Sequence, residues 1–378
     1  MNFLKRKFYS YYLQPHIEFP DRIERREYAF ILFNEDSMHR HISFSSKEAI
    51  LTYLKANVPA HAYYSSAYYR TPSASTMKEK QWMGADLIFD LDADHLPNIE
   101  NLTYEETLQE VKKELLKLLS FLTEDFGFGK HDIRIYFSGG RGYHCHISNK
   151  SVLELGSQER REIVDYITAR GLEIKEIVGE RSIYKDRFVD KRIEIYPDHG
   201  GWKGRIARGI INFFKQIKSM EREDAIKELM KIEGIGKKIA EALYDALTDE
   251  RMKRIEKGMI DQASEFRRIV KPLIKRLAVS LHSEADEPVT ADIKRLIRLP
   301  GSLHGKTGLK VTRVDIDAIE DFDPLTHAVV FGDDMIKVNV EKPIKIKMKE
   351  NVFELEKGAA TVPEYLAVFL VARKMAVA

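Results

Sequence analysis

The sequence predicts an α+β fold with an inserted helical subdomain, and two patterns lead to this prediction. Short apolar runs, such as residues 28–33 and 86–92, are bounded by polar turn-forming stretches and indicate strands and hairpins. From about residue 210 to 265 the alternation disappears, and Lys- and Glu-rich sequence with helical periodicity replaces it. We therefore expect one domain formed by residues 1–209 and 266–378, and an inserted helical subdomain at 210–265.

The expected elements follow from local signals in chain order. Ser45 or Ser46 is placed to cap a helix, and Thr103 is placed to cap a longer amphipathic one. Three glycines between two apolar runs indicate a tight hairpin. The expected strands are 28–33, 41–44, 86–92, 133–137, 143–148, 309–315 and 341–349, and the expected helices are 46–54, 103–123, 291–299 and the apolar C-terminus.

Composition excludes several classes of protein. The chain has 378 residues, of which 44% are apolar, so it can bury a core and is not a disordered chain. Its formal net charge is only +2, so a nucleic-acid partner would have to meet a local basic surface. A single cysteine, Cys145, rules out an intrachain disulfide and a cysteine-based metal cluster. Neither a secretory leader nor a membrane-spanning run is apparent, and we expect a cytoplasmic protein.

Asp90 and Asp92 form the sharpest local feature. Residues two apart in a strand point to the same side, so these carboxylates should converge on one face. Their mutual repulsion is relieved by a cation, and hard oxygen ligands suit Mg²⁺ or Mn²⁺, which serve nucleotidyl transfer. Two other interpretations stay open here: a solvated strand end, and the Mn²⁺ site of a nucleotide-sugar glycosyltransferase. A second pair, Asp315 and Asp317, lies in an acidic stretch typical of a surface.

Two glycine-rich segments carry groups suited to phosphate. Ser138, Arg141 and His144 lie in and beside the turn SGGRGYH (138–144), where glycines let a ligand approach the backbone N–H groups. A tight hairpin with an incidental arginine is the alternative. Arg298 and His304 lie in the loop RLPGSLHGKTG (298–308), which has a similar composition.

The motifs DLIFDLD (86–92), SGGRGYH and LPGSLHGKTG, in this order and at this spacing, resemble the catalytic small subunit of archaeal and eukaryotic DNA primases. The stretches HAYYSSAYYR (61–70) and GGWKGRIARG (200–209) resemble the archaeal branch. The similarity is spread over about residues 25 to 324. It implies a primase-type catalytic domain with an RRM-like antiparallel sheet.

The resemblance also implies roles for individual residues. The metal carboxylates would be Asp90, Asp92 and Asp286, with Asp292 a nearby competitor for the third position, and the cofactor would be Mg²⁺ or Mn²⁺ in a two-metal site. The incoming nucleotide would be held by Ser138, Arg141, His144, Arg298, His304 and Arg40. Many family members carry a zinc knuckle near the first motif. Residues 94–103 offer only His95 there, so no structural zinc is expected.

The implied function is template-directed synthesis of short primers on single-stranded DNA from nucleoside triphosphates, in a heterodimer with a large iron–sulfur subunit. Alternatives are a primase-polymerase that extends primers or fills gaps, and a catalytically silent nucleic-acid-binding subunit.

Basic stretches of the chain are candidates for template binding. Residues 181–208 combine Lys and Arg with aromatic side chains, and residues 251–276 form a second basic stretch. Residues 232–240 resemble a helix–hairpin–helix turn, although a plain turn between helices is the competing view. The candidate template-binding residues are Trp202, Lys203, Arg205, Lys237 and Lys238.

Overall fold

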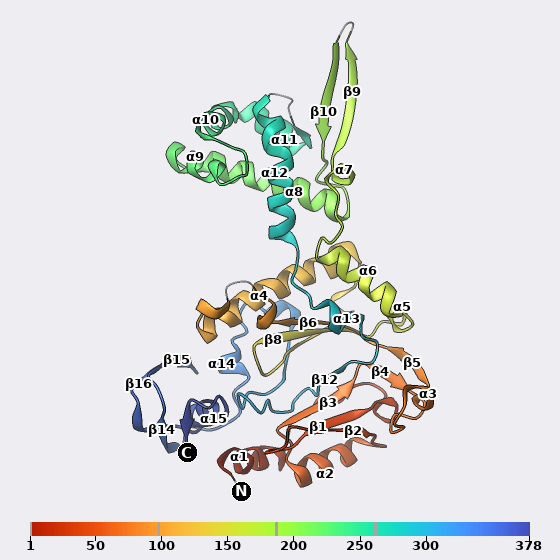
Figure 1. Cartoon of the computed structure of the whole chain (residues 1–378), viewed down its shortest axis with the longest axis vertical. Helices are drawn as coiled ribbons and strands as arrows, with labels where there is room; N and C mark the ends of the chain where they lie inside the picture. Colours follow the sequence, from red (N-terminus) through yellow and green to blue (C-terminus); the bar gives the residue numbers. More distant parts are fainter. Residues whose placement is uncertain (1, 97–98, 186–187, 261–263) are drawn as a thin grey trace. The chain divides into compact units, whose positions relative to one another are not determined.

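Three separate stretches of the chain come together in the first of two compact units of this computed structural model (Figure 1). The structure describes residues 2–96, 99–185, 188–260 and 264–378. The first unit contains Met1–Leu116, Phe128–Val164 and Glu284–Ala378, and the second contains Lys117–Gly127 and Asp165–Ser283. The predicted insert, 210–265, lies wholly within the second unit, which is larger than the insert. The domain boundaries themselves stay a prediction.

Two four-stranded antiparallel sheets form the centre of the first unit. One has the strand order β12-β3-β1-β2 and the other β13-β7-β8-β6. Their bounds are Tyr28–Ile31 (β1), Met38–Ile42 (β2), His61–Ser65 (β3), Leu87–Asp92 (β6), Ile133–Phe137 (β7), Gly142–Ile147 (β8), Leu296–Arg298 (β12) and Thr312–Val314 (β13). A short pair, β4 (Ala67–Tyr69) and β5 (Trp82–Ala85), lies beside them.

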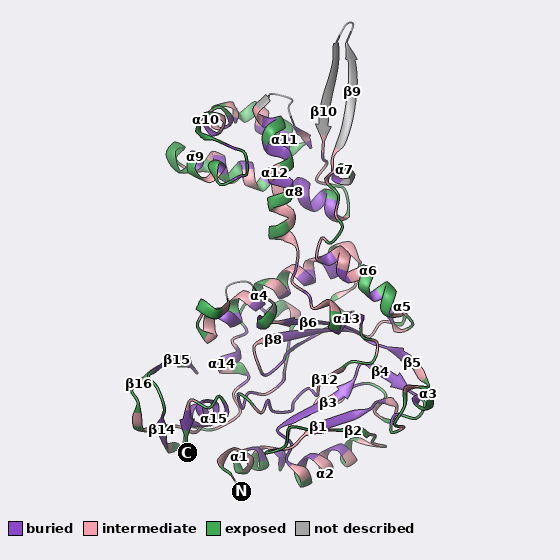
Figure 2. Cartoon of the chain, in the orientation of Figure 1, coloured by how far each residue is buried: buried purple, intermediate pink, exposed green. Residues whose placement is uncertain are grey.

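The register of β8 places the polar residues of the motifs next to one another. Asp90 on β6 lies opposite His144 on β8, and Asp92 lies opposite Gly142. Because β7 pairs with the other edge of β8, all six β8 residues are buried (Figure 2). Cys145 is among them, and burial raises the pKa of its thiol.

Helices cover these sheets. Phe8 and Tyr12 of α1 (Phe3–Tyr12) and Ile50 and Leu54 of α2 (Lys47–Asn57) belong to a buried cluster with the aromatic residues of β1. Ser46 caps α2, as expected, by accepting a hydrogen bond from the backbone N–H of Ala49 at 3.3 Å. The other helices of this part of the chain are α3 (Met77–Lys80), α4 (Tyr104–Ser120), α5 (Lys150–Leu153), α6 (Ser157–Ile167), α13 (Glu287–Ala291) and α14 (Pro324–His327).

The C-terminal segment adds two small sheets and a helix. The strand order of one sheet is β17-β14-β18, and β15 pairs with β16. Burial alternates along β15, as its Lys-alternating sequence predicts. Helix α15 (Glu364–Ala372) is apolar and almost wholly buried. The strand bounds are Met335–Val340 (β14), Ile344–Met348 (β15), Asn351–Leu355 (β16), Gly358–Pro363 (β17) and Ala376–Val377 (β18).

The second unit is mostly helical and also carries a β-hairpin. Its helices are α7 (Ile174–Ile177), α8 (Gly201–Ser219), α9 (Arg222–Met230), α10 (Lys237–Ala246), α11 (Asp249–Glu256) and α12 (Ser264–Leu281). Its strands are β9 (Gly179–Lys185), β10 (Phe188–Glu194) and β11 (Met259–Ile260). No helix in the described part of the chain is long and apolar enough to cross a membrane.

The α+β class with antiparallel sheets is confirmed, and most expected elements are present. The predicted helix at 291–299 is wrong. That segment instead ends helix α13 and forms strand β12, where Ile297 lies opposite Tyr64 of β3. The open edge of β3 offers backbone hydrogen bonds that a short apolar run cannot signal in advance. The expected strand at 309–315 is shorter, Thr312–Val314.

A buried ion pair lies directly before β6, and its loss should destabilise the first unit. Arg26 and Asp86 lie 2.7 Å apart, with side chains 1% and 3% exposed, and Tyr68 also donates to Asp86. Asp86→Asn leaves the Arg26 charge buried without a counter-charge, so we expect a loss of about 3–5 kcal/mol in the free energy of unfolding. Urea denaturation measures this loss. Glu110→Gln, which breaks the exposed Glu110–Lys113 pair, should barely move the midpoint. Equal effects of the two variants would contradict the prediction.

Candidate active site

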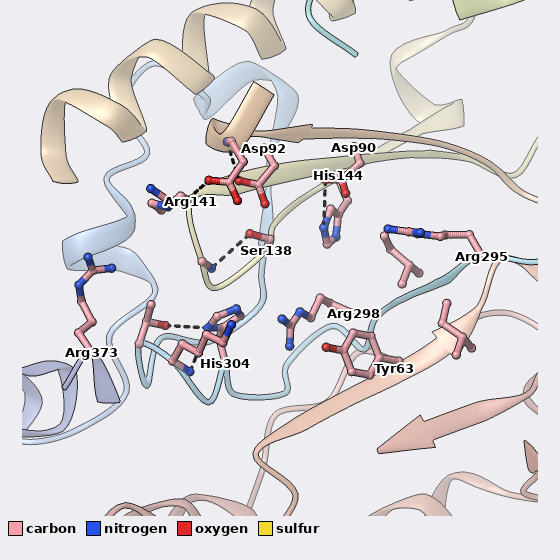
Figure 3. Close-up of a pocket in the computed structure, with 16 residues that line it drawn as sticks. Tyr63, Asp90, Asp92, Ser138, Arg141, His144, Arg295, Arg298, His304 and Arg373 are labelled. Carbon is pink, nitrogen blue, oxygen red and sulfur yellow. Dashed lines mark hydrogen bonds and ion pairs between the residues drawn. The ribbon is translucent and has the colours of Figure 1, made fainter. Parts of the chain in front are cut away.

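A cavity of about 550 Å³ opens in the first unit, and both large sheets contribute to its wall (Figure 3). From the sheet that contains β6 and β8 come Asp90, Asp92 and His144, and from the other sheet come Tyr63 and Arg298. The remaining wall includes Asp94, Ser138, Gly140, Arg141, Arg295, His304, Lys306, Thr307 and Arg373.

The carboxylate pair lies on one wall of this cavity. Asp90 and Asp92 both face the cavity from β6, as the strand period predicts. An oxygen of Asp90 lies 3.5 Å from Nε2 of His144. An oxygen of Asp92 accepts a hydrogen bond from the backbone N–H of Asp94 at 3.3 Å. Both carboxylates are therefore part of the cavity wall, where they can meet a ligand.

Hydrogen bonds within the glycine-rich turn between β7 and β8 stabilise its conformation. The hydroxyl oxygen of Ser138 accepts hydrogen bonds from the backbone N–H groups of Gly140 and Gly142, each at 3.2 Å. Gly139 has φ +77°, and a Cβ there would lie 2.8 Å from Cβ of His304. The turn consequently needs glycine at this position, both for its backbone conformation and for close packing against the 298–308 loop.

The 298–308 loop fixes the other polar side chains of the cavity. Nδ1 of His304 accepts a hydrogen bond from the backbone N–H of Lys306 at 3.3 Å, and the Thr307 hydroxyl donates to the Gly139 carbonyl at 2.5 Å. The Arg298 guanidinium contacts His61 and lies 4.7 Å from the centre of the Tyr63 ring.

Burial makes the histidines of the site poor bases. It lowers the pKa of His61 to about 3, with the Arg298 charge adding to the effect, and lowers that of His144 to about 3. It also lowers the pKa of His304 well below its usual value. At neutral pH these imidazoles are uncharged N–H donors. The positive charge of the cavity wall therefore comes from its arginines and Lys306.

The cavity brings together seven of the residues predicted for nucleotide or metal binding: Asp90, Asp92, Ser138, Arg141, His144, Arg298 and His304. Asp286 is not among the lining residues, but its backbone N–H donates to the Asp90 carbonyl at 3.0 Å. Within the described residues, no three His, Cys, Asp or Glu side chains are grouped so that they could hold a metal ion.

Arg40 lies outside this cavity. It lines a neighbouring cavity of about 370 Å³ that shares Tyr63, Arg295 and Leu296 with the first. Its guanidinium donates a hydrogen bond to the Glu27 carboxylate at 3.2 Å. The competitor Asp292 lines the same neighbouring cavity. The second acidic pair lies elsewhere, where Asp317 pairs with Lys130 on the surface.

Several lining residues were not predicted. Tyr63 lies within the HAYYSSAYYR stretch, and Arg295 lies three residues before Arg298, so both had a nearby motif as a signal. Asp94 follows the first acidic pair, and it forms an ion pair with Arg141. Arg373 follows the C-terminal helix far along the chain, and no local pattern marks it.

The candidate template residues divide into two groups. Trp202 and Arg205 are 5% and 8% exposed. The Trp202 indole donates to the Tyr166 carbonyl at 2.7 Å, and Arg205 pairs with Asp125 at 2.8 Å. These internal contacts argue against a template contact for the two side chains. Lys203, Lys237 and Lys238 are exposed on α8 and α10.

Some predictions concern residues beyond the described set. The side chains of residues 179–193, with the expected aromatic contacts of Tyr184 and Phe188, are among them. So are residues 97–98 and the side chain of His95, in the segment for which the resemblance led us to expect no structural zinc.

Fold and cavity together define a class of protein. A carboxylate pair faces arginines, N–H donors and a glycine-rich turn within an α+β unit, which is the composition of sites that act on nucleotide polyphosphates.

Comparison with known proteins names the family. Residues 89–316 match the family model described as DNA primase small subunit. The chain is 45% identical to the DNA primase small subunit PriS of Methanococcoides burtonii, over 98% of this chain and 96% of the relative. It is 43% identical to PriS of Methanothrix thermoacetophila, over 99% and 98%, and 40% identical to PriS of Archaeoglobus fulgidus, over 98% and 96%. The chain belongs to the DNA primase small subunit family, and the resemblance seen in the motifs is confirmed.

The buried histidines predict a loss of stability in mild acid. Burial lowers the pKa of His61 to about 3 and those of His146 and His304 well below their usual value. Below about pH 6.5 the unfolded chain binds protons at these positions and the folded chain does not, so stability falls as pH falls, by about 1.4 kcal/mol per pH unit for each such histidine.

Urea unfolding at about pH 7 and about pH 5.5 tests this dependence. His146→Asn should weaken the pH dependence, whereas His131→Gln, at a side chain 87% exposed, should leave it unchanged. A midpoint that does not move between the two pH values would contradict the prediction.

Gly139→Ala should destabilise the turn more than a matched glycine substitution elsewhere. Gly127 also has a positive φ, +71°, but no atom lies within 4 Å of a Cβ there. Gly127→Ala should therefore cost only the conformational penalty of about 1–2 kcal/mol. Gly139→Ala adds the collision with His304, and a comparison of the two unfolding free energies isolates it. Equal costs would show that the turn can move away from the loop.

Proposed function

We propose that this chain is the catalytic subunit of a DNA primase, which synthesises short primers on single-stranded DNA by template-directed nucleotidyl transfer from nucleoside triphosphates. The carboxylate pair Asp90–Asp92, which lines one cavity together with Arg141 and Arg298, is the observation that supports this most strongly. Relatives that cover nearly the whole chain are named DNA primase small subunit, which supports the same proposal.

The donor set fits a divalent cation such as Mg²⁺ or Mn²⁺. Asp90 and Asp92 would hold it through their oxygen atoms, because Mg²⁺ is commonly bound by one or two carboxylates together with substrate phosphates and water. Asp286 remains the proposed third carboxylate, because its backbone N–H donates a hydrogen bond to the Asp90 carbonyl and so holds the two residues close together. A bound cation would neutralise phosphate charge and lower the pKa of the attacking 3′-hydroxyl, which is the chemistry of two-metal nucleotidyl transfer.

The chain's own residues would bind and orient the triphosphate. Arg298 and Arg141 supply charge to phosphate oxygens, and neutral His144 and His304 supply N–H donors. The Ser138 hydroxyl accepts two backbone hydrogen bonds, so its own proton is free to be donated to a phosphate. Tyr63, whose ring lies beside Arg298, offers an aromatic surface next to the same cavity.

Two partners belong to this proposal. The template would follow exposed basic side chains, for which Lys203, Lys237 and Lys238 are the remaining candidates. A large iron–sulfur subunit would complete a heterodimer, since this chain, with one buried cysteine, has no thiolates with which to hold such a cluster.

Primer synthesis by two matched acidic-pair variants tests the proposal. Wild-type chain, Asp90→Asn/Asp92→Asn and Asp315→Asn/Asp317→Asn receive unprimed single-stranded DNA, labelled nucleotides and Mg²⁺ or Mn²⁺. Labelled oligomers should form with the wild type and with the 315/317 variant, because that pair lies outside the cavity. They should fall at least about 100-fold with the 90/92 variant, since the cation's carboxylates are lost.

Each other outcome has a distinct meaning. Extension of a supplied primer without synthesis on bare template would favour the gap-filling primase-polymerase. If the wild type makes no product even with a large subunit added, or if the 90/92 variant is fully active, the proposed function is wrong.

A further inference from the structure

Arg373 is a cation of the cavity that none of the motifs includes. It follows helix α15 directly and lines the cavity together with Arg141 (Figure 3). The matched segment of the family model, 89–316, ends well before it. Its position in the wall therefore comes from the fold of the C-terminal segment.

Aromatic contacts hold Arg373 in place. Its guanidinium carbon lies 4.6 Å from the centre of the Tyr104 ring and 5.6 Å from that of Phe369. The Tyr104 hydroxyl in turn donates to the Gly140 carbonyl at 2.5 Å. One tyrosine thus joins this arginine to the glycine-rich turn, so that the two parts of the wall are positioned together.

Arg373 has no counter-charge among the residues that the structure describes, whereas Arg141 pairs with Asp94. Arg373 is an exposed residue, but the partial burial of its guanidinium group lowers its pKa, and the Arg141 charge lowers it further. Two guanidinium groups that face one cavity repel each other, and an anion bound between them removes that repulsion. The observed arrangement is therefore suited to a ligand with several negative charges at this end of the cavity.

The position of the pair relative to the carboxylates indicates which part of a nucleotide would lie there. In Figure 3, Arg141 and Arg373 lie nearer the Asp92 end of the carboxylate pair, and Tyr63 and Arg295 lie nearer the Asp90 end. The phosphate under attack must lie beside the carboxylates. The side with an aromatic ring suits the nucleoside, and the side with two guanidinium groups suits the outer phosphates.

We propose that Arg373 joins Arg141 in binding the outer, β- and γ-phosphates of the incoming nucleoside triphosphate, and hence the pyrophosphate that leaves. This inference rests on the proposed function. It makes Arg373 a phosphate-binding residue supplied by the C-terminal helix, with the stacking on Tyr104 fixing its direction. Guanidinium groups can meet phosphate oxygens with two parallel hydrogen bonds, which a lysine cannot reproduce.

Binding measurements on the full chain test the role of Arg373. The variants are Arg373→Gln, Arg373→Lys and, as matched control, Lys374→Gln at the exposed neighbour. The probes are a nucleoside triphosphate, the corresponding monophosphate and inorganic pyrophosphate. We expect Arg373→Gln to weaken triphosphate and pyrophosphate binding by about 10–100-fold, because a charge-assisted hydrogen bond is lost. Monophosphate affinity and melting temperature should stay unchanged, Arg373→Lys should bind with intermediate affinity, and Lys374→Gln should match the wild type.

The opposite outcomes are distinguishable. If Arg373→Gln weakens monophosphate and triphosphate binding equally, Arg373 acts on the nucleoside or on the fold, and the inference is wrong. Triphosphate affinity that is unchanged in Arg373→Gln, in a chain whose wild type binds triphosphate and makes primers, would overturn the inference alone. A wild type that neither binds triphosphate nor makes product would overturn the proposed function together with it.

Discussion

The pairing register between β6 and β8 is the constraint on which the rest of the site depends. It sets Asp90 opposite His144 and Asp92 opposite Gly142, and so joins the acidic pair to the glycine-rich turn. A slip of one residue would turn every side chain of β6 to the other face. The buried β8, paired on both edges, makes such a slip costly, and Gly142 adds a steric check, since a Cβ there would lie 2.5 Å from the Leu91 carbonyl oxygen.

The charges that line the site suit the ligand proposed above. The two carboxylates on β6 repel each other, and so do the guanidinium groups of Arg141 and Arg373, while burial keeps His144 uncharged. Within the site, the ion pair between Arg141 and Asp94 balances part of the positive charge. A bound polyphosphate with a divalent cation carries the two missing kinds of charge together, so its binding would satisfy both groups at once.

The sequence predicted the features of the site that depend on neighbouring residues, but not those that depend on contacts between distant parts of the chain. Side chains two apart on a strand point to the same side, so the sequence predicted that Asp90 and Asp92 share one face. The glycines after Ser138 likewise predicted the turn there. Segment 291–299 was misassigned because its strand depends on the free edge of β3. Burial of Trp202 and Arg205 depends on Tyr166 and Asp125, which are distant in the chain. Arg373 reaches the cavity only through the packing of α15, which no motif records.

The lone cysteine has a consequence for the chemistry of the whole chain. Cys145 is enclosed within the central strand of its sheet, and its thiol resists ionisation. Since the thiolate is the species of cysteine that reacts with oxidants, disulfides and alkylating reagents, Cys145 is protected from all three in the folded chain. Oxidative stress therefore has no cysteine through which to switch or cross-link this chain. A cysteine introduced on the surface would be its one reactive thiol, so a spectroscopic label could be placed there without first removing a native residue.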